Sequence, residues 1–314
     1  MTLSLALELS LAVLIVSAAA WCVFAKRSFA ASVAFVSLGL LLTIVWVQLG
    51  APDVALTEAA LGSGLTGVLL LGASARLRDS AAEQAAPTGA GRRLLAAVAC
   101  TVVSAGLAYA VLNPTEPAPT LAPAALASLP QLQLGNPVTG VLMGYRAIDT
   151  LLEVVVLLFA LVAVWSLTPD RYWGGRAGEP PAPQVDGVLP YFGKVLPPLG
   201  LVIGAYLFWI GSDAPGGEFQ SAAVLAAMGL LIVLAGVRSA PRISDRRLRM
   251  LIAVGPLVFI AVAFAGLGLA GAFLGYPPEH AKAVILLIEV PVTLSLAVML
   301  VLLVLGPSGQ AEDR

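Results

Sequence analysis

Nine apolar runs, each long enough to cross a lipid bilayer, limit what this chain can fold into. A hydrocarbon core of about 30 Å needs roughly 17–25 apolar residues in a helix, and 59% of the 314 residues are hydrophobic while 11% are charged. The alternating dyads of a membrane β-barrel are missing, so the sequence predicts an all-α, polytopic membrane protein. The nine predicted spans are 3–25, 29–49, 53–75, 93–112, 138–167, 195–211, 220–237, 250–274 and 283–305.

The basic residues between these runs predict the orientation of the chain. Lys and Arg gather after the first, third, fifth and seventh runs, which lie on one side of the membrane if the spans alternate. Cytoplasmic loops carry an excess of Lys and Arg. We therefore expect the N-terminus outside and the C-terminus inside, with Arg146 and Lys282 as the departures from the pattern.

Shifts in composition divide the chain into three blocks and a linker. Residues 1–112 form the first block. The second, 113–170, opens with a Pro-rich segment without Lys or Arg, which is predicted to be an external loop. A hydrophilic Gly/Pro segment, 171–186, is predicted to be a cytoplasmic linker. It leads to a third block, 187–314, with four spans.

A stripe of charged residues lies in the fifth run. Arg146, Asp149 and Glu153 are three and four residues apart, so on a helix they share one face. Charges inside a bilayer are costly unless they face protein, water or one another, which makes a proton or ion pathway the first hypothesis. The alternative is that Arg146 and Asp149 anchor the helix at headgroup level. That alternative does not account for Glu153, two turns deeper than Arg146.

The third run carries two carboxylates. Pro52 and Asp53 fit the first helical turn, where a negative charge complements the helix dipole. Asp53 is therefore interpreted as a cap, with a place in the ion pathway as the alternative. Glu58 lies more than a turn inside the run and precedes the small residues of 62–67, which allow close helix approach. We expect Glu58 either to exchange protons or to hydrogen-bond a neighbouring helix.

The third block adds further candidates. Glu289 lies inside the ninth run beside Pro291, whose ring perturbs a helix, and an ionisable residue at that depth is a functional candidate. The sequence from Asp213 to Glu218, DAPGGE, predicts a tight turn with glycine at positive φ that enters a helix. It is either a plain turn or a loop that lines protein or water at membrane depth. Asp213, Glu218 and Lys282 are secondary candidates for the ion pathway.

Other kinds of site are not predicted. Cys22 and Cys100 lie in apolar runs and are interpreted as reduced packing residues. His280 is the single histidine, and one His without other ligands makes a poor metal site. The sequence has no phosphate-binding glycine loop, nucleophile constellation, redox-cofactor motif or basic patch with aromatics. We expect no cofactor, no metal and no nucleic-acid partner.

Two segments of the first half resemble membrane subunits of hydrogenases. Residues 136–153, NPVTGVLMGYRAIDTLLE, resemble the signature of the hydrogenase MbhE domain, which is also fused into the large subunit of Mrp-type Na+/H+ antiporters. Residues 51–71, APDVALTEAALGSGLTGVLLL, resemble the hydrogenase MbhD domain. Many antiporter relatives have their acid where this chain has Gly62, so the position of Glu58 favours the hydrogenase-type branch. The two blocks together also resemble the five-span J-type membrane subunit of respiratory complex I.

The third block is similar to the MnhB-type domain of Mrp antiporters. The family pattern Gly-His-x-x-Pro-Gly-Gly-Gly-Phe aligns with residues 211–219, GSDAPGGEF. Ser212 replaces the His, which argues against a proton relay through this loop, and Glu218 replaces a Gly. The segments LAGAFLGYP and LLIEVPVTLSLAVMLV resemble the last two spans of the MnhB-type domain.

These resemblances imply a membrane subunit of an Mrp-type cation/proton antiporter module in the cytoplasmic (inner) membrane of a prokaryote. They imply transport of H+ and Na+, other Mrp- or hydrogenase-type membrane subunits as partners, and no enzymatic activity of its own. One alternative is a membrane-arm subunit of a hydrogenase or a complex I-related oxidoreductase. Another is a structural scaffold without an ion path. A self-contained transporter would show paired inverted repeats, and the sequence shows no convincing repeat.

Overall fold

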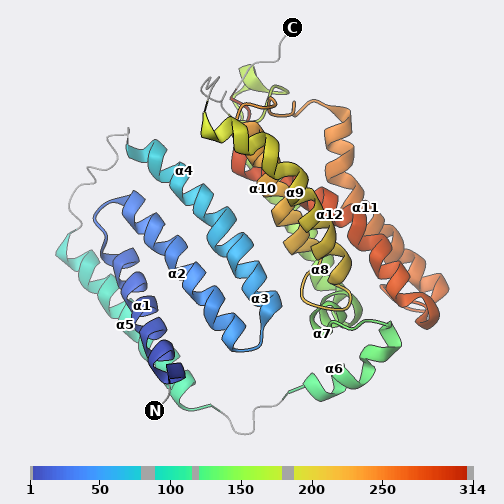
Figure 1. Ribbon diagram of the computed structural model, residues 1–314, viewed down its shortest axis with the longest axis horizontal. Helices are drawn as coiled ribbons and strands as arrows, with labels where there is room; N and C mark the ends of the chain where they lie inside the picture. Colours follow the sequence, from blue (N-terminus) through green and yellow to red (C-terminus); the bar gives the residue numbers. More distant parts are fainter. Residues whose placement is uncertain (1–2, 79–88, 115–119, 179–186, 310–314) are drawn as a thin grey trace.

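The computed structural model describes residues 3–78, 89–114, 120–178 and 187–309, and within these ranges the protein is a bundle of helices without strands (Figure 1). Long apolar stretches form its long helices because a helix satisfies every backbone group within the segment. These are α1 (Leu3–Phe24), α2 (Ser28–Gln48), α5 (Ala90–Leu112), α8 (Ala147–Ser166), α9 (Val188–Ile210), α10 (Glu218–Leu234), α11 (Arg246–Leu269) and α12 (Ala281–Leu305). One further span is built from α3 (Pro52–Thr57), the π-helix η1 (Glu58–Leu65) and α4 (Thr66–Arg78).

The apolar helices of the described ranges follow the order of the predicted runs. Eight helices of the described ranges are long and apolar enough to cross a membrane, and α10 is a shorter apolar helix of 17 residues. Each corresponds to one predicted run. The first and last described residues lie at opposite ends of the bundle (Figure 1). The predicted all-α, polytopic membrane fold is confirmed.

The fifth span differs from the expected continuous helix. The predicted range 138–167 is divided into α7 (Pro137–Thr139), the π-helix η4 (Gly140–Tyr145) and α8. Glycine is a poor helix former, and η4 contains Gly140 and Gly144, over which Leu129 and Leu132 pack. The Thr150 hydroxyl donates to the Leu142 carbonyl at 2.8 Å. The break therefore keeps one of its carbonyls satisfied.

The Pro-rich segment before that span contains short helices. α6 (Ala122–Ser128) and the 3-10 helix η3 (Leu129–Leu132) lie at the lower end of the molecule in Figure 1. The Tyr145 hydroxyl donates to the Ala125 carbonyl at 2.8 Å. The described part of this segment thus packs against η4.

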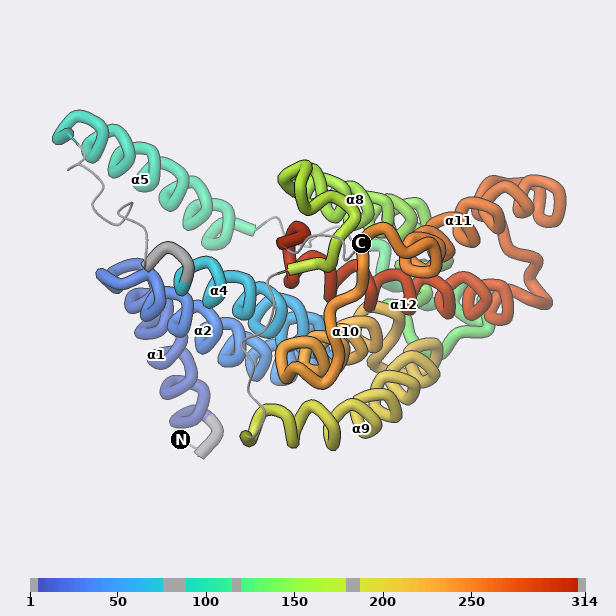
Figure 2. The backbone as a smooth tube through the Cα atoms, turned by 90° about the horizontal axis from the view of Figure 1, so that it is seen from above, coloured from blue at the N-terminus to red at the C-terminus, as the bar shows by residue number. Residues whose placement is uncertain are grey.

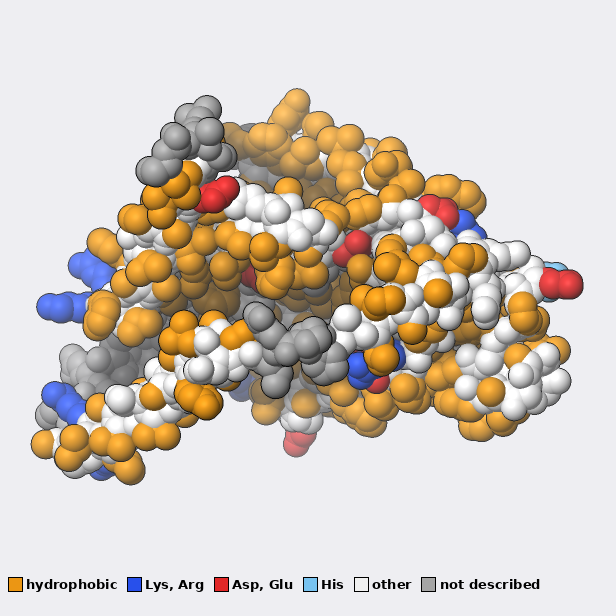
Figure 3. Space-filling view, turned by 90° about the horizontal axis from the view of Figure 1, so that it is seen from below, with side chains coloured by type: hydrophobic (Ala, Val, Ile, Leu, Met, Phe, Trp, Pro, Cys, Tyr) orange, Lys and Arg blue, Asp and Glu red, His pale blue; other side chains and the backbone are white. Residues whose placement is uncertain are grey.

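The core lies in the second half of the chain, around α12. This helix packs on α8, α10 and α11, and side chains such as Ile288, Leu296, Phe259 and Val154 are completely buried. In contrast, no residue of α5 is buried, and Figure 2 shows α5 standing apart from the rest. Hydrophobic side chains cover much of the face seen in Figure 3, as lipid-facing or partner-facing surfaces do.

Hydrogen bonds between loops connect the segment after α8 to the loop between α10 and α11 and to the segment after α12. The backbone of Ala177 donates to the Pro241 carbonyl at 3.2 Å, and the Ser308 hydroxyl donates to the Arg176 carbonyl at 2.8 Å. Both contacts involve the first half of the predicted linker. Residues 179–186 of that linker, including the Pro-rich part, lie outside the described residues, as do residues 79–88 and 115–119 of the two preceding loops.

Candidate ion-pathway site

Asp53 joins the first block to the other two. It lies in the first turn of α3 and is buried, with 7% of its surface exposed. Its carboxylate accepts from the backbone N–H of Gly216 at 3.0 Å and from the Asn136 amide at 3.4 Å. The cap interpretation accounts for the position of Asp53 in its helix. It does not account for these hydrogen bonds, which reach two other blocks.

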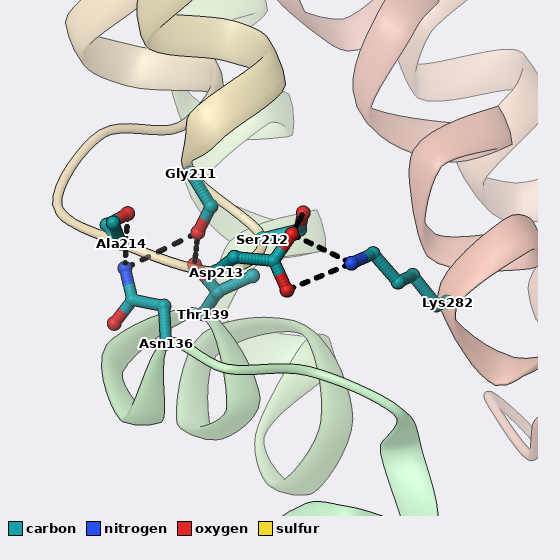
Figure 4. A network of polar contacts seen from close by, with 7 residues as sticks. All are labelled: Asn136, Thr139, Gly211, Ser212, Asp213, Ala214 and Lys282. Carbon is teal, nitrogen blue, oxygen red and sulfur yellow. Dashed lines mark hydrogen bonds and ion pairs between the residues drawn. The ribbon is translucent and has the colours of Figure 1, made fainter.

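Asn136 and Thr139 join the second block to the loop between α9 and α10 (Figure 4). The Asn136 side chain accepts from the Val138 backbone N–H at 2.9 Å, as helix N-caps do, and donates to the carbonyls of Gly211 and Ala214 at 3.2 and 3.1 Å. The Thr139 hydroxyl donates to the same Gly211 carbonyl at 2.6 Å. One short loop therefore receives side chains from two blocks.

Glycine lets this loop turn tightly. Gly216 and Gly217 have φ of 154° and 127°, as predicted from the sequence. A Cβ on Gly216 would lie 2.5 Å from the Leu207 carbonyl oxygen. Ser212, which stands where the family pattern has His, is buried, and its carbonyl accepts from the backbone N–H groups of Gly135 and Asn136.

A cavity of about 290 Å³ lies beside this junction. It is lined from the first block by Asp53 and Thr57, from the second by Thr139 and Glu153, and from the third by Glu218 and Gln220. Glu153 and Glu218 lie close enough for the charge of Glu218 to act on Glu153. The structure thus brings three candidate carboxylates, one from each block, to one cavity.

Glu218 also faces a fourth candidate. Glu218 begins α10 and is 6% exposed, and Glu289 lies well inside α12 and is 1% exposed. Their carboxyl groups hydrogen-bond to each other. The interior of the third block therefore holds two facing acids, one of which also lines the cavity.

Glu58 lies on a different side of its helix. It is half-buried at the start of η1, and its carboxylate is held against Gly62 of its own helix and Gly39 of α2, with Ser63 beside it. The Ser63 hydroxyl is buried without a partner among the described residues. Glu58 does not line the cavity, so the structure separates it from Asp53.

The charged stripe of the fifth span is divided in the same way. Arg146 and Asp149 form an ion pair of 2.6 Å with both side chains exposed, so they satisfy each other at the lower end of α8. Glu153, one turn further along α8, lines the cavity instead. The role of the whole stripe in a pathway stays a prediction.

Asp213 and Lys282 form a second ion pair, which links the α9–α10 loop to the start of α12 (Figure 4). The Lys282 ammonium donates to both carboxylate oxygens at 2.8 and 2.7 Å. Its hydrogen bonds, together with that from the Ser212 hydroxyl, hold the pKa of Asp213 below its ordinary value. The pair is exposed and lies at the edge of the junction.

Sequence reasoning missed the polar side chains that hold the junction. Asn136 and Thr139 belong to the pattern of residues 136–153, and the Asn-Pro pair does signal a helix start. Gln220 directly follows the aligned residues 211–219. Their partners are backbone carbonyls and hydroxyls 70 or more residues away, which no local pattern reveals. Among the described residues, no group of three or more His, Cys, Asp or Glu could hold a metal ion.

Two family models match separate parts of the chain. Residues 13–79 match the MbhD model, which describes a subunit of MBH, and residues 188–307 match the "Domain related to MnhB subunit of Na+/H+ antiporter". The chain therefore carries an MbhD domain followed by an MnhB-type domain, which confirms both resemblances seen in the sequence. Neither model covers the MbhE-like segment, whose assignment stays a prediction. No curated protein matches this sequence.

Two solved structures are similar to this one. A chain of the Mrp complex from Dietzia sp. DQ12-45-1b matches over 97% of this chain and 35% of its own length, with 25% identity and a TM-score of 0.74. A chain of the membrane-bound sulfane sulfur reductase, an archaeal respiratory membrane complex, matches over 68% of this chain and 98% of its own, with 24% identity and a TM-score of 0.54. This chain thus spans about a third of the Mrp chain, and the second likeness concerns the fold alone.

Proposed function

We propose that this chain, with its MbhD and MnhB-type domains, is a membrane subunit of a multisubunit Mrp-type cation/proton antiporter module. In that module it contributes to coupled movement of protons and sodium ions. The observation that carries the proposal is the cavity to which each of the three blocks contributes one carboxylate, Asp53, Glu153 and Glu218. The fold similarity to a chain of an Mrp complex supports the same conclusion.

The cavity has the chemistry that a proton-handling site needs. Carboxylates bind and release protons, and an ionisable group at membrane depth is costly unless it faces protein or water. Glu153 and Glu218 come from different helices and interact electrostatically, so the protonation of one depends on that of the other. Asp53 is held by hydrogen bonds from Gly216 and Asn136. Movement of these segments would therefore change the surroundings of an acid that lines the cavity.

The work of the chain would be transport within a complex, with other Mrp- or hydrogenase-type membrane subunits as partners. Its place would be the cytoplasmic membrane of a prokaryote. A redox enzyme driving the complex is the alternative that the MbhD domain supports, because that domain bears the name of a hydrogenase component. A pure scaffold is supported by the junction itself, in which hydrogen bonds join all three blocks.

Replacing Glu153 separates transport from scaffolding. In the assembled complex in membrane vesicles, we expect Glu153→Gln and Glu153→Ala both to reduce Na+-driven proton movement at least about tenfold, because an amide keeps hydrogen bonds but carries no proton. Proton movement is followed with a pH-sensitive dye. The control is Asp170→Asn, at an exposed acid that follows the C-terminal end of α8, which should behave as the wild type.

Assembly must be measured alongside transport, by the amount of partner subunits that copurify with the variant. Unchanged assembly with lost coupling supports proton handling. Wild-type coupling in Glu153→Gln would remove Glu153 from the pathway, and lost assembly with normal activity per remaining complex would favour the scaffold.

A further inference from the structure

The buried acids Glu218 and Glu289 make an unusual contact. Both belong to the third block, from α10 and α12, and 6% and 1% of their surfaces are exposed. An ionised carboxylate only accepts hydrogen bonds, so a hydrogen bond between two carboxyl groups needs a proton on one of them. Two negative charges on adjacent carboxyl groups in a buried site would also repel each other strongly.

We propose that Glu218 and Glu289 form a carboxyl pair that holds one shared proton and exchanges it with the cavity through Glu218. As a step of ion transport, the pair rests on the proposed function above. As a proton-binding site, it stands on its own geometry.

The surroundings of the pair favour a proton over a metal ion. The ionisable groups that face the pair are Glu153 on α8 and Tyr276 in the loop before α12, and Asp53 lines the same cavity as Glu218. Lys282, at the start of α12, is engaged with Asp213. No cation therefore neutralises the pair within the described residues. A charge of −1 for a pair that shares a proton is easier to bury than the −2 of two carboxylates.

Two polar atoms without a hydrogen-bond partner indicate that Tyr276 belongs to the surroundings of the pair. Glu289 Oε1 and the Tyr276 hydroxyl are both buried without a hydrogen-bond partner among the described residues. Burial raises the pKa of Tyr276 above its ordinary value, so its O–H remains a donor. One bridging water would satisfy both atoms. Tyr276 would then orient the Glu289 carboxyl.

Glu218 is the residue of the pair that connects it to the cavity. It lines the cavity with Glu153, whereas Glu289 does not. Glu218 also begins α10, where the helix dipole favours its ionised form. Glu289, in the middle of a helix, has no such support. The proton should therefore reside mainly on Glu289 and leave through Glu218.

Infrared spectroscopy tests the pair without any transport assay. In the purified full-length chain labelled with ¹³C-carboxyl glutamate, we expect the carbonyl band of a protonated acid at neutral pH, shifted by the label. Glu289→Gln should abolish this band. Glu218→Gln should keep a band but shift its frequency, because an amide replaces the carboxylate that accepts from the Glu289 carboxyl and burial still disfavours a lone anion there. Glu279→Gln, at an exposed acid of the neighbouring loop, should keep it.

Proton counting gives an independent measurement. At neutral pH the wild type should hold about one more proton per chain than the double variant Glu218→Gln/Glu289→Gln. A wild type without the band, with Na+-dependent melting that both single variants lose, would mean that the pair binds a cation, and would overturn the proposal. If a variant misfolds, the wild-type band and its loss on raising pH still decide the matter. Intact transport in a variant without the band would refute only the pathway role.

Discussion

At the scale of single residues, the acids differ in what surrounds them rather than in their spacing. Glu58 was expected either to exchange protons or to hydrogen-bond a neighbouring helix, and both remain predictions; its carboxylate packs against Gly39 of α2. Small residues at 62–67 were interpreted as allowing close helix approach. Gly62 has a second effect that no spacing rule contains, because its missing side chain leaves the space that the Glu58 carboxylate fills.

Filling that space should displace Glu58. A Cβ on residue 62 would lie 2.5 Å from Glu58 Oε1, so we expect Gly62→Ala to melt at a lower temperature than the matched variant Gly72→Ala, by a free energy on the order of 1 kcal/mol. Gly72→Ala is the matched control, because no atom lies within 4 Å of its added Cβ and alanine favours a helix. Combining Gly62→Ala with Glu58→Ala should remove the clash, so that Gly62→Ala no longer lowers the melting temperature in the Glu58→Ala background. If Gly62→Ala still lowered the melting temperature when Glu58 is alanine, the Glu58 carboxylate would not be the group that the added methyl displaces.

At the scale of elements, hydropathy predicted the existence and order of the helices and missed their internal breaks. The third and fifth spans each contain a π-helix, η1 and η4. π-helices are frequent at functional sites, and here Glu58 begins η1 while Arg146 follows η4. A wider helical turn depends on packing partners such as Leu129 over Gly140. Those contacts join segments whose pairing is not encoded in any local window of sequence.

The ion pair between the α9–α10 loop and α12 should make stability depend on pH. The folded pKa of Asp213 is lowered, so the pair contributes fully above the unfolded pKa of about 3.9, and the contribution is lost as pH falls through the folded value. Asp213→Asn should therefore destabilise at neutral pH, by about 0.2–1 kcal/mol for an exposed pair, and cost nothing in stronger acid. Melting curves across pH, with Glu279→Gln as control, measure this. An equal loss at all pH values would assign the effect to the Ser212 hydrogen bond.

At the scale of the whole molecule, charge and hydropathy predicted how the helices are arranged, whereas they did not predict the contacts of the candidate site. The C-terminal ends of α4, α8 and α10, which basic residues follow in the sequence, lie toward the end of the bundle that also holds the last described residues (Figure 1). The junction of Asp53, Asn136 and Gly216 could not be foreseen in the same way, because it depends on how three blocks dock. This arrangement does not by itself say which end of the bundle faces the cytoplasm.

We propose that the end with the basic loops faces the cytoplasm, since Lys and Arg concentrate in cytoplasmic loops. Cysteine labelling can test this after Cys22 and Cys100 are replaced by serine. With a membrane-impermeant maleimide added to intact cells, a cysteine at Ala124 in α6 should react. Cysteines at Ala90 and Asp170, beside the basic residues that follow the third and fifth runs, should react only after the membrane is opened. All three positions are exposed in the isolated chain, so burial within it does not explain a missing signal. Labelling at Ala90 and Asp170 in intact cells, with Ala124 protected, would reverse the orientation and place the cavity of Asp53, Glu153 and Glu218 near the cytoplasmic surface.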